Sequence, residues 1–468
     1  MDLQQLLSLT AKASYLLAAI LFILGIKRMA SPVTARRGIV QAGIGMVIAT
    51  LATFAITRGH NVGLIIAAIA VGVIPTWLWG KRVAMTDMPQ MVALFNGMGG
   101  GSAAAIGAIE LFKLTEPGAM APRLDFVSLA VLGALIGSVS MTGSLIAWAK
   151  LDGRMDRRFN FPGQQVFNFL VFAAAIAFGI ALIAWQVQPL LIIAFFALAL
   201  LFGVLMTLPI GGADMPVVIS LFNALTGLAV AFEGYVMQNP ALIIAGMVVG
   251  AAGLFLTQLM AKAMNRPISG VLFSNFGGGG SGEEIAGVQK PIEASDAASL
   301  LYMADKVIIV PGYGMAVAQA QHKIWELAQA LIKAGKDVKF AIHPVAGRMP
   351  GHMNGLLAEA GVPYDLIADM DEINPEFKTC DVAIVIGAND VVNPAAKTDK
   401  SSPIFGMPIL DVVDARQTIV IKRGKGTGFA GIENALFYQD NTRMLYADGK
   451  EAASRLISEL KAIEGSGH

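Results

Sequence analysis

Four glycine-rich segments in the second half of the chain contain residue types that hold phosphate groups. They are residues 311–314 (PGYG), 345–350 (VAGRMP), 387–390 (GAND) and 422–428 (KRGKGTG). Glycine lets a ligand approach backbone N–H groups closely, and lysine or arginine supplies the charge that an anion needs. Any one of these segments alone is more often an ordinary turn or a solvated charge. Four of them together indicate a nucleotide-binding site.

The segment around Gly312 shows which nucleotide pose does not fit. Gly312 and Gly314 match the first two glycines of the dinucleotide fingerprint GxGxxG, but Val317 takes the third position. The acidic residue that usually binds the ribose at the end of the second strand is also missing, because His343 and Pro344 stand there. The sequence therefore disfavours NAD in its usual pose.

Two basic residues favour a phosphorylated dinucleotide instead. Lys422 and Arg423 follow a predicted strand and lead into a glycine-rich loop at 424–428. A lysine and an arginine beside such a loop suit a 2′-phosphate. We therefore expect NADP rather than NAD.

Regularly alternating elements must position these segments. Short apolar runs, most of them rich in β-branched residues, predict strands at 307–310, 338–342, 382–386, 418–421 and 444–446. Helices are expected between them at 315–334 and 352–359, and a last helix is expected after them at 451–463. Strands that alternate with helices imply a Rossmann-like, doubly wound parallel sheet. In such sheets ligands bind beyond the carboxyl ends of the strands, which is where the glycine-rich segments fall.

The first half of the chain has a different character, that of a membrane protein. Of the 468 residues, 55% are hydrophobic and 14% are charged, against about 25% charged in soluble domains. A membrane-crossing helix needs about 20 apolar residues. Nine runs qualify, and the division between the sixth and seventh is the least distinct: 8–26, 38–57, 61–80, 88–111, 126–149, 165–185, 188–206, 215–236 and 240–261.

These patterns divide the chain into two domains and a connector. We expect an α-helical membrane domain at 1–262, a linker at 263–295 and the α/β domain at 296–468. The glycine run at 277–280 favours a passive tether, although a flexible join would also permit motion. The net charge of +1 excludes a general electrostatic attraction to nucleic acid.

Basic residues in the loops predict the orientation. Lysine and arginine gather after the first, third, fifth and ninth spans, whereas the alternate loops contain only Arg58, Lys113 and Arg123. Basic loops stay in the cytoplasm. We therefore expect the N-terminus outside and the nucleotide domain in the cytoplasm.

An internal repeat places polar side chains in the membrane. Residues 87–96 and 214–223 both follow the pattern DMPxxxxLFN. Asp87 and Asp214 suit a helix N-cap, and Asn96 and Asn223 each lie seven residues, about 10 Å, past the proline of their copy. These amides serve either as interhelical hydrogen-bonding groups or as part of a proton or water path. No carboxylate or histidine is central in a span, and Asp214 and Glu233 lie near span ends.

Five motifs closely resemble the beta subunit of proton-translocating NAD(P) transhydrogenase. They are GYGMAVAQAQ, HPVAGRMPGHMN, MDEIN, GANDVVNPAA and KRGKGTGFAG. The resemblance covers nearly the whole chain. It implies hydride transfer between NAD(H) and NADP(H), coupled to proton passage across a bacterial inner membrane. It also implies an α component that binds NAD(H) and adds membrane helices, and a dimer of the assembled protomers.

The resemblance carries site residues onto matching positions. In that family NADP is reversed relative to the usual Rossmann pose, and the cofactors rather than protein groups perform the chemistry, so no catalytic residue and no metal site are expected. The expected NADP(H) contacts are Tyr313, Val345, Ala346, Gly347, Arg348, Met349, Pro350, Gly387, Ala388, Asn389, Asp390, Val391, Gly406, Met407, Lys422, Arg423, Gly424, Lys425, Gly426, Thr427, Gly428, Phe429, Asp448 and Gly449.

The membrane part departs from the family at one position. Some members have a histidine implicated in proton passage where this chain has Asn96. Asparagine takes up no proton at physiological pH, so the proton-accepting group is expected on the α component or in a water path. Candidate residues of that path are Asn96, Ser144, Asp214 and Asn223.

Two other functions fit parts of the sequence. A transporter or channel gated by a nucleotide sensor would also join membrane helices to a nucleotide domain, but the full set of NADP-loop motifs argues against it. A membrane-anchored NADP dehydrogenase with its own organic substrate would need a substrate domain and a proton-transfer site, and neither is evident.

Overall fold

The computed structural model describes most of the chain as two compact units. The described residues are 3–56, 61–116, 123–155, 161–185, 187–211, 214–273, 285, 287–424, 426–428 and 430–466. One unit comprises Met1–Gly211 and Val217–Thr257, and the other comprises Gly212–Pro216 and Gln258–His468. Each unit is described by itself.

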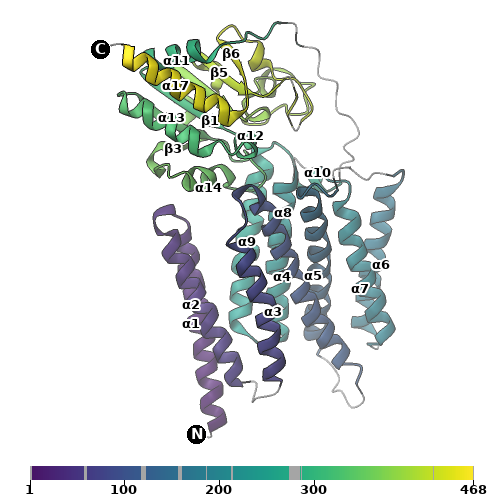
Figure 1. The fold of residues 1–468 in the computed structure, drawn as a ribbon. Coiled ribbons are helices and arrows are strands. Elements are labelled where there is room, and N and C mark those ends of the chain that lie inside the picture. Colours follow the sequence, from purple (N-terminus) through teal and green to yellow (C-terminus); the bar gives the residue numbers. More distant parts are fainter. Residues whose placement is uncertain are drawn as a thin grey trace. The chain divides into compact units, whose positions relative to one another are not determined.

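The nine predicted spans are confirmed. Among the described residues, nine helices are long and apolar enough to cross a membrane (Figure 1). A proline at the start of α7 makes the boundary between the sixth and seventh helices sharp, because proline suits the first helical turn. The helices are α1 (Leu3–Met29), α2 (Pro32–Ile56), α3 (Val62–Gly80), α4 (Met88–Lys113), α5 (Leu124–Leu151), α6 (Gln164–Ala184), α7 (Pro189–Thr207), α8 (Met215–Val236) and α9 (Pro240–Ala263).

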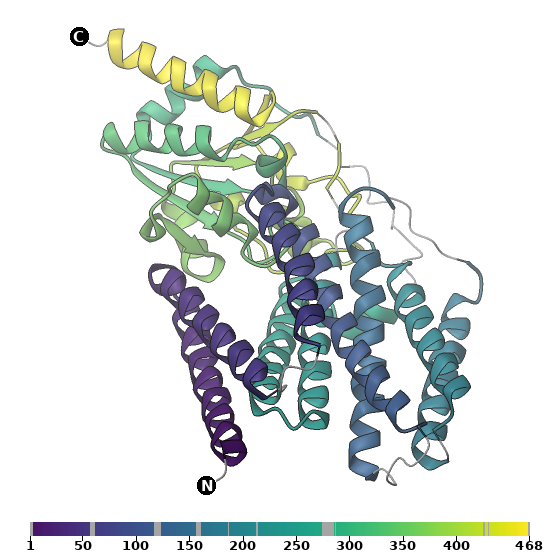
Figure 2. The same cartoon turned by 60° about the horizontal axis from the view of Figure 1, so that its bottom comes forward.

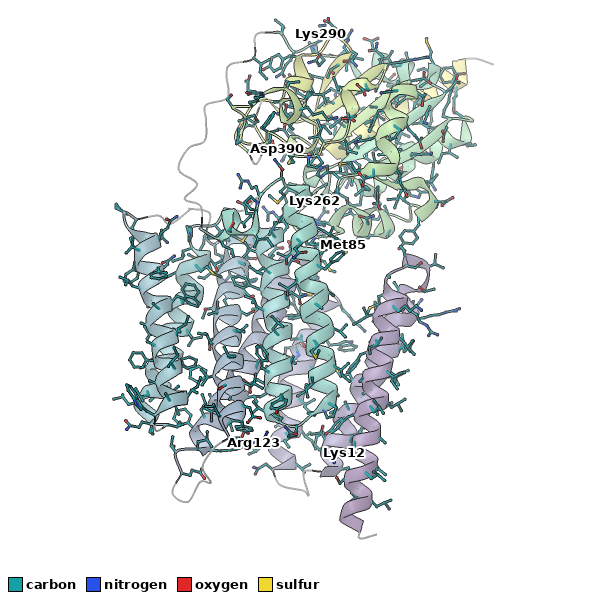
Figure 3. The ribbon with its side chains drawn as sticks, turned by 180° about the vertical axis from the view of Figure 1, so that it is seen from behind. Lys12, Met85, Arg123, Lys262, Lys290 and Asp390 are labelled. Atoms are coloured by element: carbon teal, nitrogen blue, oxygen red, sulfur yellow. The ribbon has the colours of Figure 1, made fainter. Side chains whose placement is uncertain are left out.

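Glycines let the membrane helices pack backbone to backbone. Helices α4 and α5 are antiparallel, so Met85 before α4 and Arg123 before α5 lie at opposite ends of the helical unit (Figure 3). A Cβ atom on Gly137 of α5 would lie 2.6 Å from the Gly100 carbonyl oxygen of α4. A Cβ on Gly227 of α8 would lie 2.5 Å from the Gly250 nitrogen of α9. Small residues permit this close packing in lipid.

The two copies of the DMP repeat behave differently. Asp87 stands at the N-cap of α4, after the short 3-10 helix η1 (Met85–Asp87), but its side chain makes no capping hydrogen bond. Asp214 is buried and accepts hydrogen bonds from Arg266 at 2.9 and 3.2 Å. The sequence thus predicts the N-cap position of Asp87. The ion pair between Asp214 and Arg266 has no counterpart in the sequence repeat, so it could not be predicted from it.

The α/β unit contains the expected parallel sheet. Six strands among the described residues run in the order β3-β2-β1-β4-β5-β6, and every paired neighbour is parallel. Five were predicted, and the short β3 was missed because only three residues pair. The strands are β1 (Lys306–Pro311), β2 (Asp337–Ile342), β3 (Ile367–Asp369), β4 (Val382–Ile386), β5 (Gln417–Lys422) and β6 (Thr442–Tyr446).

Helices cover both faces of this sheet. On one face α11 (Ala294–Met303), α13 (Gln321–Lys333) and α17 (Gly449–Ser466) pack together (Figures 1 and 2). On the other face Ile308 and Val385 join a buried cluster with Ile373 and Phe377. Alternate residues of each central strand are therefore buried on opposite faces, as a doubly wound sheet requires. The remaining elements are α10 (Ile268–Phe273), α14 (His352–Glu359), α15 (Met370–Ile373), α16 (Ala395–Thr398) and the 3-10 helices η3 (Tyr364–Leu366), η4 (Asn374–Thr379), η5 (Asp390–Val392), η6 (Val412–Asp414) and η7 (Ala435–Tyr438).

The structure differs from two expectations about this unit, and part of the second lies outside the described residues. The helix predicted at 315–334 is two helices, α12 (Tyr313–Val317) and α13, because Gln319 adopts φ 48°, which breaks the α-helical path. The predicted linker at 263–295 includes α10 and the start of α11. Its glycine run at 277–280 lies outside the described residues.

We predict that Gly137→Val destabilises the helical unit. The added side chain would force α4 and α5 apart, at a cost of roughly 1–3 kcal/mol. Thermal unfolding in detergent should show a lower Tm than for the native chain. Gly72→Val in α3 is the matched control, because a Cβ there meets nothing within 4 Å. Equal loss in both variants would contradict the importance of this contact.

Candidate functional site

The candidate site lies at the carboxyl ends of β1 and β4. These two strands are neighbours at the centre of the sheet, where the strand order changes direction. Dinucleotides bind at this switch point in sheets of this order. The Gly312 N–H donates to the Ile386 carbonyl at 2.9 Å, and the Gly314 N–H donates to the Gly387 carbonyl at 3.0 Å. The two turns therefore form one continuous backbone surface.

Only glycine allows the two turns to approach this closely. A Cβ on Gly312 would lie 2.4 Å from the Gly387 carbonyl oxygen. Gly387 has φ +70°, and a Cβ on it would lie 2.1 Å from the Met315 nitrogen. Val317, at the position of the missing third glycine, is exposed. The close packing that a third glycine usually permits is therefore supplied here by Gly387.

The loop after β2 is held against the Gly312 turn by aromatic and cationic side chains. The Arg348 guanidinium lies over the Tyr313 ring, 4.5 Å from its centre, and the His352 ring centre is 6.0 Å from that of Tyr313. His352 Nδ1 accepts a hydrogen bond from the Arg348 N–H at 3.2 Å. Gly347 has φ +109°, which favours glycine at this bend. The predicted segment 345–350 is thus brought beside Tyr313.

A buried histidine fixes both ends of this loop region. His343 Nδ1 accepts from the Val345 N–H at 3.2 Å, so its Nε2 carries the proton and donates to the Pro408 carbonyl at 2.8 Å. The His343 side chain is 1% exposed. Burial lowers its pKa from 6.5 to about 4. The neutral ring joins the loop after β2 to the segment that contains Met407.

The turn after β4 is bonded to the loop after β5. Asp390 Oδ2 accepts from the Ala430 N–H at 2.9 Å, and a Cβ on Gly428 would lie 2.3 Å from Asp390 Oδ1. Asn434 donates to the Asn389 carbonyl at 2.9 Å. Asp390, labelled in Figure 3, therefore positions Gly428 and Ala430 as well as bordering the candidate site.

Lys422 presents a positive charge at the end of β5. Its ammonium group lies 4.7 Å from the centre of the Phe437 ring and donates to the Gly426 carbonyl. Burial lowers the pKa of Lys422, and the negative charges of Glu433 and Asp390 oppose that change. Arg423 is exposed. Of the predicted loop 424–429, Lys425 and Phe429 lie outside the described residues.

The remaining predicted contacts also meet at this end of the sheet. A Cβ on Gly449 would lie 3.3 Å from both the Ala318 Cβ and the Ile386 Cδ1. The Gly406 N–H donates to the Ala396 carbonyl at 2.8 Å. The structure thus gathers the segments that sequence reasoning selected, apart from the two residues that it does not describe.

Sequence reasoning missed four buried polar residues that hold the site together: His343, His352, Asn393 and Asn434. Asn393 Oδ1 accepts from the Ala395 N–H at 3.1 Å and from the Ala435 N–H at 3.2 Å. Asn434 Oδ1 accepts from the Leu436 N–H at 2.9 Å. The available signal was that His343 and Asn393 each precede a proline, and His343 does so directly after a predicted strand.

The polar residues of the membrane helices are only partly brought together. Asn96 donates to Ser144 Oγ at 2.9 Å, and both side chains are buried. Ser140 Oγ lies 2.6 Å from Thr226 Oγ1 and donates to the Phe222 carbonyl at 3.0 Å. No hydrogen bond joins Asn223 to the Asn96–Ser144 pair within the described part of the chain. Asp214 forms its separate pair with Arg266.

The geometry suits the binding of a phosphorylated dinucleotide. The glycine turns present backbone without side chains, and Lys422 and Arg348 add positive charge near the same strand ends. Within the described residues, no group of three or more His, Cys, Asp or Glu side chains could hold a metal ion. What the protein supplies here is binding and orientation of a reactive cofactor.

Comparisons with known proteins agree along nearly the full length. The family model described as NAD(P) transhydrogenase beta subunit matches residues 11–459. The NAD(P) transhydrogenase subunit beta of Rhodospirillum rubrum is 44% identical over 466 residues, which covers 96% of this chain and 98% of that protein. The same protein from a named strain of this species gives the same values.

We predict that His343 makes the stability of the α/β unit depend on pH. Above pH 6.5 the ring is neutral in both folded and unfolded states, so its contribution is complete. As the pH falls toward 4 only the unfolded state takes up the proton, so ~3 kcal/mol of stability is lost. Chemical denaturation of a fragment spanning 287–466 between pH 7 and pH 4 measures this loss.

His343→Gln is the control for this prediction. Its amide N–H still reaches toward Pro408 but does not titrate, so the difference between the two pH profiles isolates the histidine. Identical pH profiles for the native and His343→Gln fragments would show that the histidine is not buried in its neutral form.

Proposed function

Because the chain belongs to the family of NAD(P) transhydrogenase beta subunits, we propose that its α/β unit binds NADP(H) and that its membrane helices conduct protons while hydride is exchanged with NAD(H). A beta subunit implies an alpha partner. In this proposal the partner holds NAD(H) and adds membrane helices, and two assembled protomers form a dimer.

The choice of cofactor rests on one observation: the end of β2 has no acidic side chain, whereas the end of β5 carries two cations. His343 follows β2, and both of its ring nitrogens are already hydrogen-bonded, to the Val345 N–H and the Pro408 carbonyl. Lys422 and Arg423 stand at the end of β5. A 2′-phosphate would meet positive charge there, and a free ribose would lack its usual acidic partner. This supports NADP(H) over NAD(H).

The residues present fit such a cofactor. The Gly312 and Gly387 turns pack against each other without side chains, so they leave a smooth backbone surface at the strand ends that a pyrophosphate could approach closely. Lys422 is half-buried and forms no ion pair with any described residue. A bound phosphate would supply the missing negative charge. In this proposal Gly424–Phe429 cover the cofactor, and Asp390 anchors the following residue Ala430.

The nicotinamide ring supplies the hydride chemistry when the cofactor is bound. This chain's residues then bind and orient the ring beside the NAD(H) of the partner, since proximity and alignment are what such a transfer needs. Asp390, Val391 and the 345–350 loop lie where the strand ends meet and would set the orientation. No protein nucleophile or acid–base group takes part in this proposal.

Coupling requires that proton binding and cofactor redox state bias the same conformational equilibrium. The buried Asn96–Ser144 pair and the Ser140–Thr226 pair provide hydroxyl and amide groups inside the helical unit. Asp214 with Arg266 lies where α8 begins, and Asn223 lies farther along that helix. The proposed orientation, with the N-terminus outside and the α/β unit in the cytoplasm, is supported by the basic loops after α1, α3, α5 and α9.

We predict coupled hydride and proton transfer by the assembled enzyme. This chain and its NAD(H)-binding partner would be reconstituted in vesicles with NADPH and an oxidised NAD analogue. Reduction of the analogue and acidification on one side of the vesicle membrane should appear together, and both should stop when either cofactor is omitted. A proton carrier should abolish the acidification but not the reduction. Solute flux without hydride transfer would instead indicate a nucleotide-gated transporter.

We predict that Lys422→Ala weakens NADP(H) binding. Loss of a charge-assisted contact with phosphate costs roughly 1.5–3 kcal/mol, or about 10–100-fold in Kd. Isothermal titration of the full chain in detergent would measure it. Lys378→Ala is the matched control, because Lys378 is exposed and precedes β4 at the opposite edge of the sheet. Unchanged affinity in Lys422→Ala would remove this residue from the phosphate site.

A further inference from the structure

A carboxylate is buried inside the helical unit near the end of α8. Glu233 stands three residues before the last residue of this helix, and its side chain is 1% exposed. Among the described residues, neither Glu233 carboxyl oxygen has a hydrogen-bond partner. It lies about 27 Å along the helix axis from the start of α8, at 1.5 Å per residue. Asp214 and Glu233 therefore mark opposite ends of one helix.

Two glycines on neighbouring helices make room for this side chain. A Cβ on Gly133 of α5 would lie 2.4 Å from Glu233 Oε1, and a Cβ on Gly107 of α4 would lie 2.7 Å from the same atom. Alanine at either position would therefore clash with the carboxyl group. Helices α4, α5 and α8 run side by side in this region (Figure 1). The carboxyl group thus points into the contact between three helices.

Polar groups on the same helices lie at successive levels. On α5, Ser144, Ser140 and Gly133 are separated by four and seven residues, which places them on one face. Ser144 bonds Asn96, and Ser140 bonds Thr226. Thr226 and Glu233 are likewise seven residues, about 10 Å, apart on one face of α8. Glu233 is the acidic end of this series.

Within the described part of the chain, the charged groups around Glu233 offer it no cation. On α4, Glu110 lies one turn beyond Gly107 and pairs with Lys113 at 2.6 Å. On α5, Asp125 pairs with Arg123 at 2.6 Å and accepts from the Tyr235 hydroxyl of α8 at 2.9 Å. The only charged residue within α9 is Lys262, at the far end of that helix. An ionised carboxylate without a partner is costly in such surroundings.

We propose that Glu233 is a proton-binding residue of the membrane helices, which exchanges a proton with the aqueous side at which α8 ends. One carboxylate oxygen accepts a proton from water and forms an O–H bond, which leaves a neutral acid. Release reverses this step and restores the carboxylate. The inference rests on the proposed function, because it assigns a site on the proton route. Thr226 and Ser140 are the next groups that can donate and accept along that route.

Glu233→Gln tests the assignment in the assembled enzyme. Glutamine keeps the size of the side chain but cannot exchange a proton at physiological pH. In vesicles that contain this chain and its partner, proton-coupled hydride transfer should fall at least tenfold, while NADP(H) affinity stays unchanged. Glu233→Asp should recover part of the activity with an altered pH profile. Glu116→Gln, at an exposed position at the same end of the helical unit, is the matched control.

Infrared difference spectroscopy of the full native chain provides a readout without hydride transfer. The carbonyl stretching band of a protonated carboxyl group should appear as the pH is lowered, should shift in Glu233→Asp and should be absent in Glu233→Gln. This measurement decides the question even if Glu233→Gln fails to assemble, because the native and Glu233→Asp spectra remain.

Two results would overturn the assignment. One is proton-coupled turnover in Glu233→Gln equal to that of the native enzyme. The other is a native spectrum without a titrating carboxyl band that Glu233→Asp shifts. Failure of the native enzyme to bind NADP(H) or to transfer hydride would instead contradict the proposed function, and the infrared result would stand separately.

Discussion

Direct contact between backbones, made possible by glycine, is the constraint on which both units depend. In the α/β unit the Gly312 and Gly387 turns touch, and this contact forms the surface that a phosphate could approach. A single methyl group at either position would separate the strand ends. Neighbouring loops are fixed beside that surface, because the loop after β5 is hydrogen-bonded to Asp390 and Arg348 of the loop after β2 lies over the Tyr313 ring.

The same constraint acts differently between membrane helices. Gly100 and Gly137 bring α4 and α5 together without side chains between them, where lipid offers no hydrophobic driving force for association. Gly107 and Gly133 also lack side chains, yet the space there is filled by the carboxyl group of Glu233. One glycine pair on α4 and α5 thus lets the two helices pack together, and the other pair makes room for a polar side chain from α8.

Polar groups in the two units differ in how they are satisfied. His343, Asn393 and Asn434 are buried in the α/β unit, and each has defined hydrogen bonds to loop backbone, so they fix the loops in place. In the helical unit Asn96 is bonded to Ser144, but Glu233 has no partner among the described residues. A satisfied buried group stabilises one arrangement. A buried acid without a hydrogen-bond partner is costly in its ionised form, so protonation stabilises it. Such a group suits a part of the protein that must respond to protons.

The sequence by itself determined the nine spans, the parallel α/β domain and the segments that surround the candidate site. These follow from local patterns, because a membrane helix needs a long apolar run and a buried strand needs a short β-branched one. Only the tertiary structure decided the break at Gln319, the pairing of Asp214 with Arg266, the bonds of His343, and the surroundings of Glu233. Those surroundings place Glu233 of α8 against Gly107 of α4 and Gly133 of α5, which stand 126 and 100 positions before it, and no local pattern specifies which helix faces meet.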